Sequence, residues 1–292
     1  MPVSRTLRLG LIGGNITESR SPALQIVCGL SVGRNVSYDL LVPAEHGLTF
    51  AEMLDHCART GFVGVNVTYP FKEEVVRRVM PGEPVVTALG AANTVRFTPD
   101  GARCFNTDHS GFMAAYRARW GHRPPGRVLL IGAGGVGRAI AFGLAELGAE
   151  EILLHDVDSA KAEALAEAVG RHAGARLSVT GPEQLRDVTG LDGLVNGTPL
   201  GMSGKPGSPL PESVKGRPSW AFDAVYTPEH TLFRAQAEAL GADFLSGYEL
   251  YINQGMLGFH IFAGVEVTDQ RWVRRILQGI AAPPTGITSS GP

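Results

Sequence analysis

The stretch that most constrains this chain is GAGGVG at 132–137, which directly follows the apolar run RVLLI. It satisfies G-x-G-x-x-G, in which Gly132 permits a tight turn and Gly134 lets the backbone approach a pyrophosphate. Gly137 lets the next helix pack closely on the strand, and free N–H groups at the helix start would hold the phosphates. The alternative is a purely structural glycine-rich turn. The pattern predicts a strand, turn and helix that bind a dinucleotide through Gly132, Ala133, Gly134, Gly135, Val136 and Gly137.

The acidic residue after the next predicted strand bears on which dinucleotide fits. The run EILLHD ends at Asp156, whose carboxylate would accept hydrogen bonds from the adenosine ribose hydroxyls and repel a 2′-phosphate. Asp158 adds a second negative charge, either as a cofactor contact or as an acid at the start of the following helix. No arginine lies in this turn, and Lys161 is the one cation close by in sequence. We therefore expect NAD rather than NADP.

The segment before the glycine turn alternates strand and helix patterns, which is typical of a parallel sheet covered by helices. Two further short strands are expected on either side of the turn TPDG, and GHRPPG at 121–126 is the clearest break in the chain. The expected strands are 7–14, 36–43, 62–70, 127–131, 151–156, 193–199 and 219–226, and the expected helices are 21–33, 47–61, 71–79, 230–241, 247–264 and 268–280.

These elements predict an α/β protein with a Rossmann dinucleotide-binding domain and a separate substrate domain whose sheet is mostly parallel, with the active-site cleft between them. We expect the substrate domain over 1–108, completed by C-terminal helices at 248–280, and the NAD-binding domain over 109–247. A tail over 281–292 has the composition of a disordered end.

Composition excludes several classes of function. The chain has 292 residues and a net charge of −2 without a basic stripe, so nucleic acid is not expected as a partner. Three scattered cysteines without CxxC spacing favour neither a disulfide framework nor a zinc site, and no metal is expected. The N-terminus lacks a long apolar region, so we expect a cytoplasmic protein without a membrane partner.

Polar residues gather where the predicted strands end. They are Ser19, Ser21, Asn66, Thr68, Lys72, Asn93 and Asp108. The carboxyl ends of parallel strands face one crevice, so these separate motifs would converge there. A dehydrogenase needs such groups to anchor its substrate and to move a proton at the reacting oxygen. Ser21 is expected to cap the helix that begins with Pro22, which would combine hydroxyl and N–H groups into an anion site.

Seven motifs in order carry a family resemblance. SRSP, NVTYPFK, GAANT, NTD, GAGGVGRA, NGTPLGM and GYELYINQ run from residue 19 to residue 254. Together they resemble the motif set of the shikimate/quinate dehydrogenase family over nearly the whole chain.

The resemblance implies a role for each matching position. Lys72 and Asp108 would be the catalytic pair at the oxidised hydroxyl; the alternative for Lys72 is a solvated lysine paired with Glu73 or Glu74. Ser19 and Ser21 would bind the substrate carboxylate. The remaining substrate positions would be Asn66, Thr68, Asn93, Tyr226 and Gln254. Further cofactor positions would be Thr198, Val225 and Gly247, beside Asp156 and Asp158.

Departures from the family pattern shape the expected activity. NADP-dependent members of the family have a segment similar to Asn-Arg-Ser/Thr, whose arginine binds the 2′-phosphate. This chain has Asp156, Val157 and Asp158 at those positions, so that arginine is missing. His109 replaces a common glycine, and we expect it on the surface. Glu249 and Tyr251 stand where small or apolar residues are common, which leaves the substrate ring open among quinate, shikimate and an amino analogue.

The expected function is an NAD-dependent oxidoreductase that interconverts quinate or shikimate and the 3-dehydro acid. Its partner would be a small cyclic hydroxy acid, and its assembly a monomer or homodimer. The alternatives are an NADP-linked shikimate dehydrogenase, an aminoshikimate dehydrogenase, a methylenetetrahydrofolate dehydrogenase and a non-catalytic NAD sensor. Which of Lys72 and Asp108 takes the proton stays open.

Overall fold

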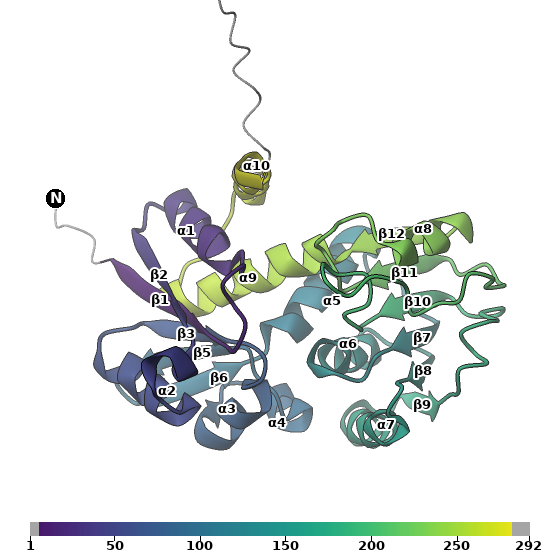
Figure 1. Cartoon of the computed structure of the whole chain (residues 1–292), viewed down its shortest axis with the longest axis horizontal. Helices are drawn as coiled ribbons and strands as arrows, with labels where there is room; N and C mark the ends of the chain where they lie inside the picture. The colour runs from purple at the N-terminus through teal and green to yellow at the C-terminus, as the bar shows by residue number, and fades with distance from the viewer. Residues whose placement is uncertain (1–5, 282–292) are drawn as a thin grey trace, which may run out of the picture.

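Two six-stranded sheets stand in two lobes, as Figure 1 shows for the computed structural model, which describes residues 6–281. The N-terminal lobe holds the order β2-β1-β3-β5-β6-β4, and the second lobe the order β12-β11-β10-β7-β8-β9. The predicted α/β class with a Rossmann half and a second α/β half is confirmed.

The N-terminal sheet is mixed, with a parallel part that carries most of the candidate substrate residues. β1 pairs in parallel with β2 and β3, whereas β5 runs antiparallel to both β3 and β6. Its strands are β1 Leu7–Ile12, β2 Val36–Leu41, β3 Gly64–Val67, β4 Met80–Pro81, β5 Thr94–Thr98 and β6 Gly101–Phe105. Its helices are α1 Ser21–Ser31, η1 Pro43–His46, α2 Phe50–Arg59, α3 Lys72–Arg78 and α4 Pro84–Leu89.

The second sheet is parallel throughout, and its order reverses between β7 and β10, which is the switch point where dinucleotides bind. Its strands are β7 Arg127–Ile131, β8 Glu151–His155, β9 Arg176–Val179, β10 Gly193–Asn196, β11 Trp220–Asp223 and β12 Asp243–Ser246. The helices α6 Gly135–Glu146, α7 Ser159–Ala173 and α8 Leu232–Ala239 connect them. The strand, turn and helix expected around the glycine motif are therefore present.

Two long helices join the lobes. α5, Thr107–Trp120, leaves the first sheet, and α9, Gly247–Ala263, returns from β12 toward α1 beside it, as Figure 1 shows. The last helix, α10 Gln270–Ala281, lies against α1. Within residues 6–281, the chain passes from the first sheet to the second along α5 and returns along α9.

Several short elements differ from the expected ones. The strand expected over 62–70 is reduced to Gly64–Val67, because Thr68 to Phe71 turn toward α3. The short elements α4, β4, β9 and β12 were not expected. The hairpin around TPDG is confirmed, with Thr98 opposite Gly101. Apart from its first residue, Ala281 at the end of α10, the expected tail lies outside the described residues.

Each lobe has its own apolar core. One core of the N-terminal lobe includes Val65, Val95, Cys57 and Cys104, and a second, under α1 and α9, includes Cys28. All three thiols are free and inaccessible. Burial raises the pKa of Cys28 and of Cys57 to about 12, and that of Cys104 to about 11.

In the part of the chain that the structure describes, no helix is both long and apolar enough to cross a bilayer.

Candidate active site

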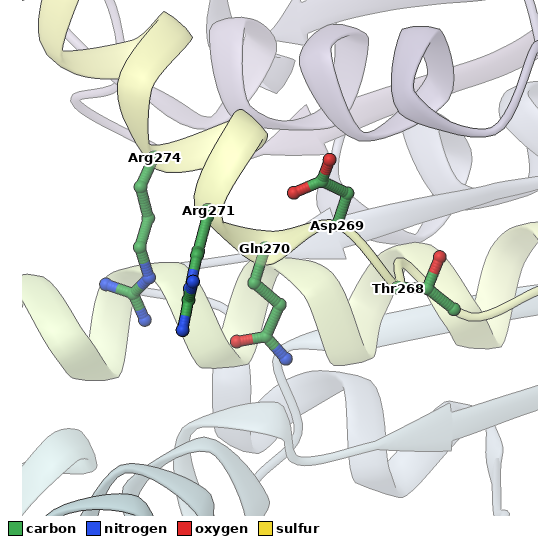
Figure 2. A pocket seen from close by; sticks show the side chains of 5 residues that line it. All are labelled: Thr268, Asp269, Gln270, Arg271 and Arg274. Atoms are coloured by element: carbon green, nitrogen blue, oxygen red, sulfur yellow. The ribbon is translucent and has the colours of Figure 1, made fainter.

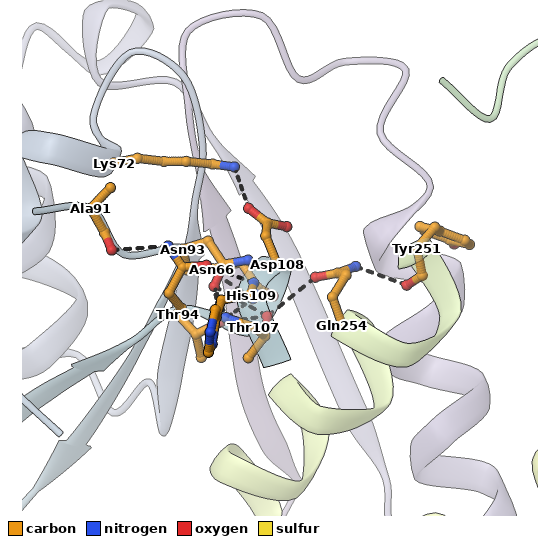
Figure 3. Close-up of polar contacts among 11 residues, drawn as sticks. Asn66, Lys72, Ala91, Asn93, Thr94, Thr107, Asp108, His109, Tyr251 and Gln254 are labelled. Carbon is orange, nitrogen blue, oxygen red and sulfur yellow. Dashed lines mark hydrogen bonds and ion pairs between the residues drawn. The ribbon is translucent and has the colours of Figure 1, made fainter. Parts of the chain in front are cut away.

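The centre of the site is an ion pair at the edge of the first lobe. Lys72 opens α3 and Asp108 lies in the first turn of α5, where Asn106 caps the helix by accepting from the His109 N–H. Lys72 Nζ lies 2.7 Å from Asp108 Oδ2, and the two side chains are 18% and 12% exposed (Figure 3). The alternative of a solvated lysine paired with Glu73 or Glu74 is wrong. A charge-assisted bond of this length fixes both groups, while both side chains stay partly exposed to solvent.

A relay of amides and hydroxyls runs beside this pair, as Figure 3 shows. Asn66 donates to Thr94 Oγ1 at 3.1 Å and to the Asn93 carbonyl at 3.3 Å. Asn93 Oδ1 accepts from the Thr107 N–H at 2.8 Å, and Thr107 Oγ1 lies 3.4 Å from Gln254 Oε1. The structure thus brings three predicted substrate residues, Asn66, Asn93 and Gln254, into one connected network.

The turn with the two serines corrects one expectation. Ser21 does not cap α1, because Arg20 already has helical backbone angles and Ser21 is the first helical residue. Ser19 Oγ instead accepts from the Ser21 N–H at 3.2 Å. Ser19 therefore orders the turn, while the Ser21 hydroxyl makes no capping bond. Thr68 lies half-buried between β3 and α3, with its N–H bonded to the Ile12 carbonyl.

Tyr226 enters the site from the second lobe. It follows β11, and its ring is stacked on Tyr251 of α9 with 4.9 Å between centroids and 13° between planes. Burial raises the pKa of Tyr226, the charge of Arg20 lowers it and that of Asp108 raises it. The phenol is therefore within the influence of the Arg20 charge, in the serine turn, and of the Asp108 charge, in the ion pair.

The glycine turn has the shape that a dinucleotide requires. Gly132 has φ of +101°, and a Cβ on Gly137 would lie 1.9 Å from the Gly132 carbonyl oxygen. A Cβ on Gly134 would meet nothing within 4 Å, so open space faces the middle of the turn. A Cβ on Gly135 would lie 3.8 Å from Lys72 Cδ. The turn therefore lies beside Lys72 and its ion pair with Asp108.

The acidic turn after β8 is held by backbone bonds. Asp156 accepts from the Ala133 N–H at 2.7 Å and from the Asp158 N–H at 2.9 Å, which ties it to the glycine turn. Asp158 occupies the N-cap position of α7 without a capping bond and lies 3.6 Å from Lys161. The side chain of Val157 is fully exposed. Within residues 6–281, the bonds that hold the Asp156 carboxylate come from these two backbone N–H groups and not from an arginine.

The other predicted cofactor positions follow three neighbouring strands. Thr198 comes after β10 and donates to Asn196 Oδ1 through its N–H and its hydroxyl. The Val225 N–H donates to Asp223, a buried carboxyl whose pKa is raised to about 6 by that burial. Gly247 opens α9, where a Cβ would lie 2.6 Å from the Ala224 carbonyl oxygen. All of these positions lie at the carboxyl edge of the second sheet, as a bound dinucleotide requires.

Some residues of the site were not expected from the sequence. Tyr38 donates to Asn66 Oδ1 at 2.8 Å, and Arg138 reaches across from α6 to the Leu89 carbonyl. His109 is only 5% exposed, so its expected surface position is wrong: α5 turns it toward Glu146 at the end of α6, 3.4 Å away. A side chain that meets a partner far along the chain leaves no periodic signal in the sequence.

A surface hollow of about 470 Å³ lies away from this site, at the start of α10 (Figure 2). It is lined by Thr268, Asp269, Gln270, Arg271 and Arg274. Arg274 is already engaged by both carboxylate oxygens of Glu249, at 2.7 and 2.9 Å. None of the predicted site residues lines this hollow. Within residues 6–281, no three His, Cys, Asp or Glu side chains gather into a metal-binding group.

Comparison with known sequences identifies relatives that match most of the chain. The family model described as shikimate dehydrogenase substrate binding domain matches residues 11–95. The quinate/shikimate dehydrogenase (NAD(+)) of Corynebacterium efficiens is 35% identical over 274 residues, covering 91% of this chain and 96% of that protein. The shikimate dehydrogenase (NADP(+)) of Streptomyces avermitilis is 35% identical over 281 residues, covering 94% and 97%.

Solved structures have the same architecture. Quinate dehydrogenase from Corynebacterium glutamicum in complex with NAD matches with a TM-score of 0.86 and 32% identity, over 93% of this chain and 99% of that one. Shikimate 5-dehydrogenase from Thermus thermophilus in complex with NADP(H) and shikimate matches with a TM-score of 0.80 and 32% identity, over 94% and 99%. Both relatives therefore span the two lobes and not one of them alone.

Proposed function

The chain belongs to the shikimate/quinate dehydrogenase family, and from this premise we propose that it oxidises quinate or shikimate to the 3-dehydro acid with NAD. One observation carries the proposal: the Lys72–Asp108 pair, 2.7 Å apart, faces the glycine turn. A group that moves a proton thus stands beside the place where a hydride acceptor is held.

The residues that would hold the cofactor fit NAD. The open space at Gly134 leaves room for the pyrophosphate, and Asp156 offers a carboxylate to the ribose. The exposed Val157 offers no positive charge to a 2′-phosphate. When bound, NAD supplies the hydride acceptor. Thr198, Val225 and Gly247 would line its nicotinamide half.

The substrate would be held by both lobes. The hydroxyls of Ser19 and Ser21, at the start of α1, suit the ring carboxylate. Asn66, Thr68, Asn93 and Gln254 would position the ring hydroxyls. Because the relay already fixes the amides of Asn66 and Asn93, little side-chain freedom is lost on binding.

The chemical step needs a place for one proton. As the ring carbon loses its hydride, its hydroxyl loses a proton to the Lys72–Asp108 pair and becomes a carbonyl. The ammonium of Lys72 stabilises the negative charge that develops on this oxygen. Asp108 holds Lys72 in place through the 2.7 Å bond. In the reverse direction the pair returns the proton.

The bounds of the two domains along the chain are also part of the proposal. Residues 1–108 with the helices of 248–280 would form the substrate domain, and 109–247 the NAD-binding domain. All strands of the first sheet precede residue 108, and all strands of the second lie between 127 and 246, which supports these bounds. We further propose a cytoplasmic monomer or homodimer, and light scattering distinguishes the two assemblies.

An absorbance assay at about 340 nm tests the function directly. Quinate, shikimate and aminoshikimate are each offered with NAD and with NADP. We expect NADH formation with quinate or shikimate. The rate with NADP should be at least tenfold lower, because a desolvated contact between like charges costs more than about 1.4 kcal/mol, the free energy that corresponds to a factor of ten. Preferred use of NADP would favour the NADP-linked alternative, and tight NAD binding without any turnover would favour a sensor.

A further inference from the structure

We propose that Tyr251 is a positioning residue, which locks the serine turn and Tyr226 to the helix that carries Gln254 and so sets the affinity for the substrate carboxylate. The inference rests on the proposed function and adds a residue to its site. Tyr251 lies on α9 and is 6% exposed, so its contacts are with protein.

The hydroxyl of Tyr251 holds the serine turn from behind. It donates to the Arg20 carbonyl at 2.8 Å, across 231 residues of chain. Arg20 lies between Ser19 and Ser21, and its carbonyl also accepts the Leu24 N–H in the first turn of α1. Burial raises the pKa of Tyr251, so its hydroxyl stays protonated and remains a donor. This bond therefore fixes the Arg20–Ser21 peptide, which lies between the two hydroxyls of the candidate carboxylate site.

The ring and backbone of Tyr251 hold two further site residues. Its ring is stacked on Tyr226, which comes from the other lobe, with centroids 4.9 Å apart. Its carbonyl accepts from Gln254 Nε2 at 3.0 Å. One residue thus joins a turn of the first lobe, a ring of the second lobe and an amide on α9. No other residue of the described chain makes hydrogen bonds or ring contacts with all three.

The chain supplies a matched control in Tyr248, on the same helix. Its ring also faces Tyr251, with centroids 5.9 Å apart, and its hydroxyl is buried. Within residues 6–281 that hydroxyl has no hydrogen-bond partner. The change of Tyr248 to Phe therefore removes a phenol oxygen of the same kind without removing a bond.

The test compares Tyr251→Phe, Tyr251→Leu and Tyr248→Phe with the wild type, using each acid and its methyl ester. Loss of a hydrogen bond to a buried carbonyl predicts that Tyr251→Phe raises KM for the acid about tenfold, with a smaller change in kcat and no change in KM for NAD. The methyl ester, which lacks the charge, should be affected much less. Tyr251→Leu should also lower kcat, because Tyr226 loses its stacking partner.

The outcomes distinguish a failure of the positioning role of Tyr251 from a failure of the proposed function. Equal behaviour of Tyr251→Phe and Tyr248→Phe, or an equal loss for acid and ester, overturns the positioning role. Thermal melting of each variant identifies a general loss of fold, and the ratio of acid to ester turnover is unaffected by the amount of folded enzyme. Failure of the proposed function would be seen in the wild type, which would then turn over neither acid.

Discussion

At the scale of single residues, the proposed function assigns the proton transfer to the Lys72–Asp108 pair. The change of Lys72 to Ala removes the ammonium 2.7 Å from Asp108. We expect turnover to fall by about 10²- to 10⁴-fold, the usual contribution of a positioned proton-transfer group. NAD affinity should change little, because the phosphates would rest on the backbone of the glycine turn. Steady-state kinetics and NAD titration measure the two effects.

Lys161 provides the control for this variant. It is another lysine with a carboxylate partner, 3.6 Å from Asp158, but its side chain is 65% exposed. Lys161→Ala should retain wild-type turnover. If Lys72→Ala kept turnover as well, the catalytic assignment would be lost.

Cofactor choice is also decided by single residues. The exposed Val157 follows Asp156, and neither side chain favours a 2′-phosphate. The double change Asp156→Asn with Val157→Arg removes a repelling charge and adds a phosphate partner. We expect the ratio of kcat/KM for NADP to that for NAD to rise at least tenfold, since a charged hydrogen bond contributes about 1.5–3 kcal/mol. Leu30→Arg, which adds one positive charge at an exposed position of α1, should leave the ratio unchanged.

At the scale of elements, the glycine turn between β7 and α6 sets the spacing of strand and helix. A Cβ on Gly137 would lie 1.9 Å from the Gly132 carbonyl oxygen, so Gly137→Ala should lower stability by about 1–3 kcal/mol. Gly134→Ala adds a Cβ in open space and should retain the melting temperature while weakening NAD binding. Denaturant unfolding and NAD titration separate these effects. Equal stability of the two variants would show that the helix can shift away.

The elements also show how far the sequence predicts the structure. Local signals were sufficient for α2, expected over 47–61 and found over Phe50–Arg59, and for the hairpin of β5 and β6. They were insufficient for β4 and β9, which are too short for a periodic pattern. The motif NVTYPFK placed Asn66 and Lys72 in the site, but not the bond from Tyr38 to Asn66. Such contacts depend on how strands and helices pack, and the spacing of residues along the chain does not determine that packing.

At the scale of the whole molecule, we expect a buried histidine to make stability depend on pH. His109 on α5 faces Glu146 of α6, and His172 of α7 lies on the other side of that carboxylate, 3.0 Å away. Burial lowers the pKa of His109 below its ordinary 6.5, Glu146 raises it and His172 lowers it, with a net lowering. Between the ordinary and the lowered pKa the unfolded chain binds the additional proton, so the folded state loses stability as the pH falls below 6.5.

Replacement of this histidine tests the origin of the effect. His109→Gln cannot be protonated and should lose less stability than the wild type between pH 8 and pH 5. His122→Gln, in an exposed loop after α5, should follow the wild type. Melting temperatures across this range provide the measurement. Parallel curves for wild type and His109→Gln would assign the pH dependence to other groups.

The buried thiols and the tryptophans can report separately on the unfolding of the two lobes. Cys28, Cys57 and Cys104 all lie in the N-terminal lobe, while Trp120 and Trp220 lie in the other, with 5.2 Å between their ring centroids. A maleimide can therefore label only chains whose first lobe has opened, and in a Trp272→Phe variant the fluorescence follows only the second. Because α5 and α9 are packed into both, we expect the two signals to change at the same denaturant concentration. Labelling that precedes the fluorescence change would reveal a half-open molecule in which the site is already split while the dinucleotide half is still folded.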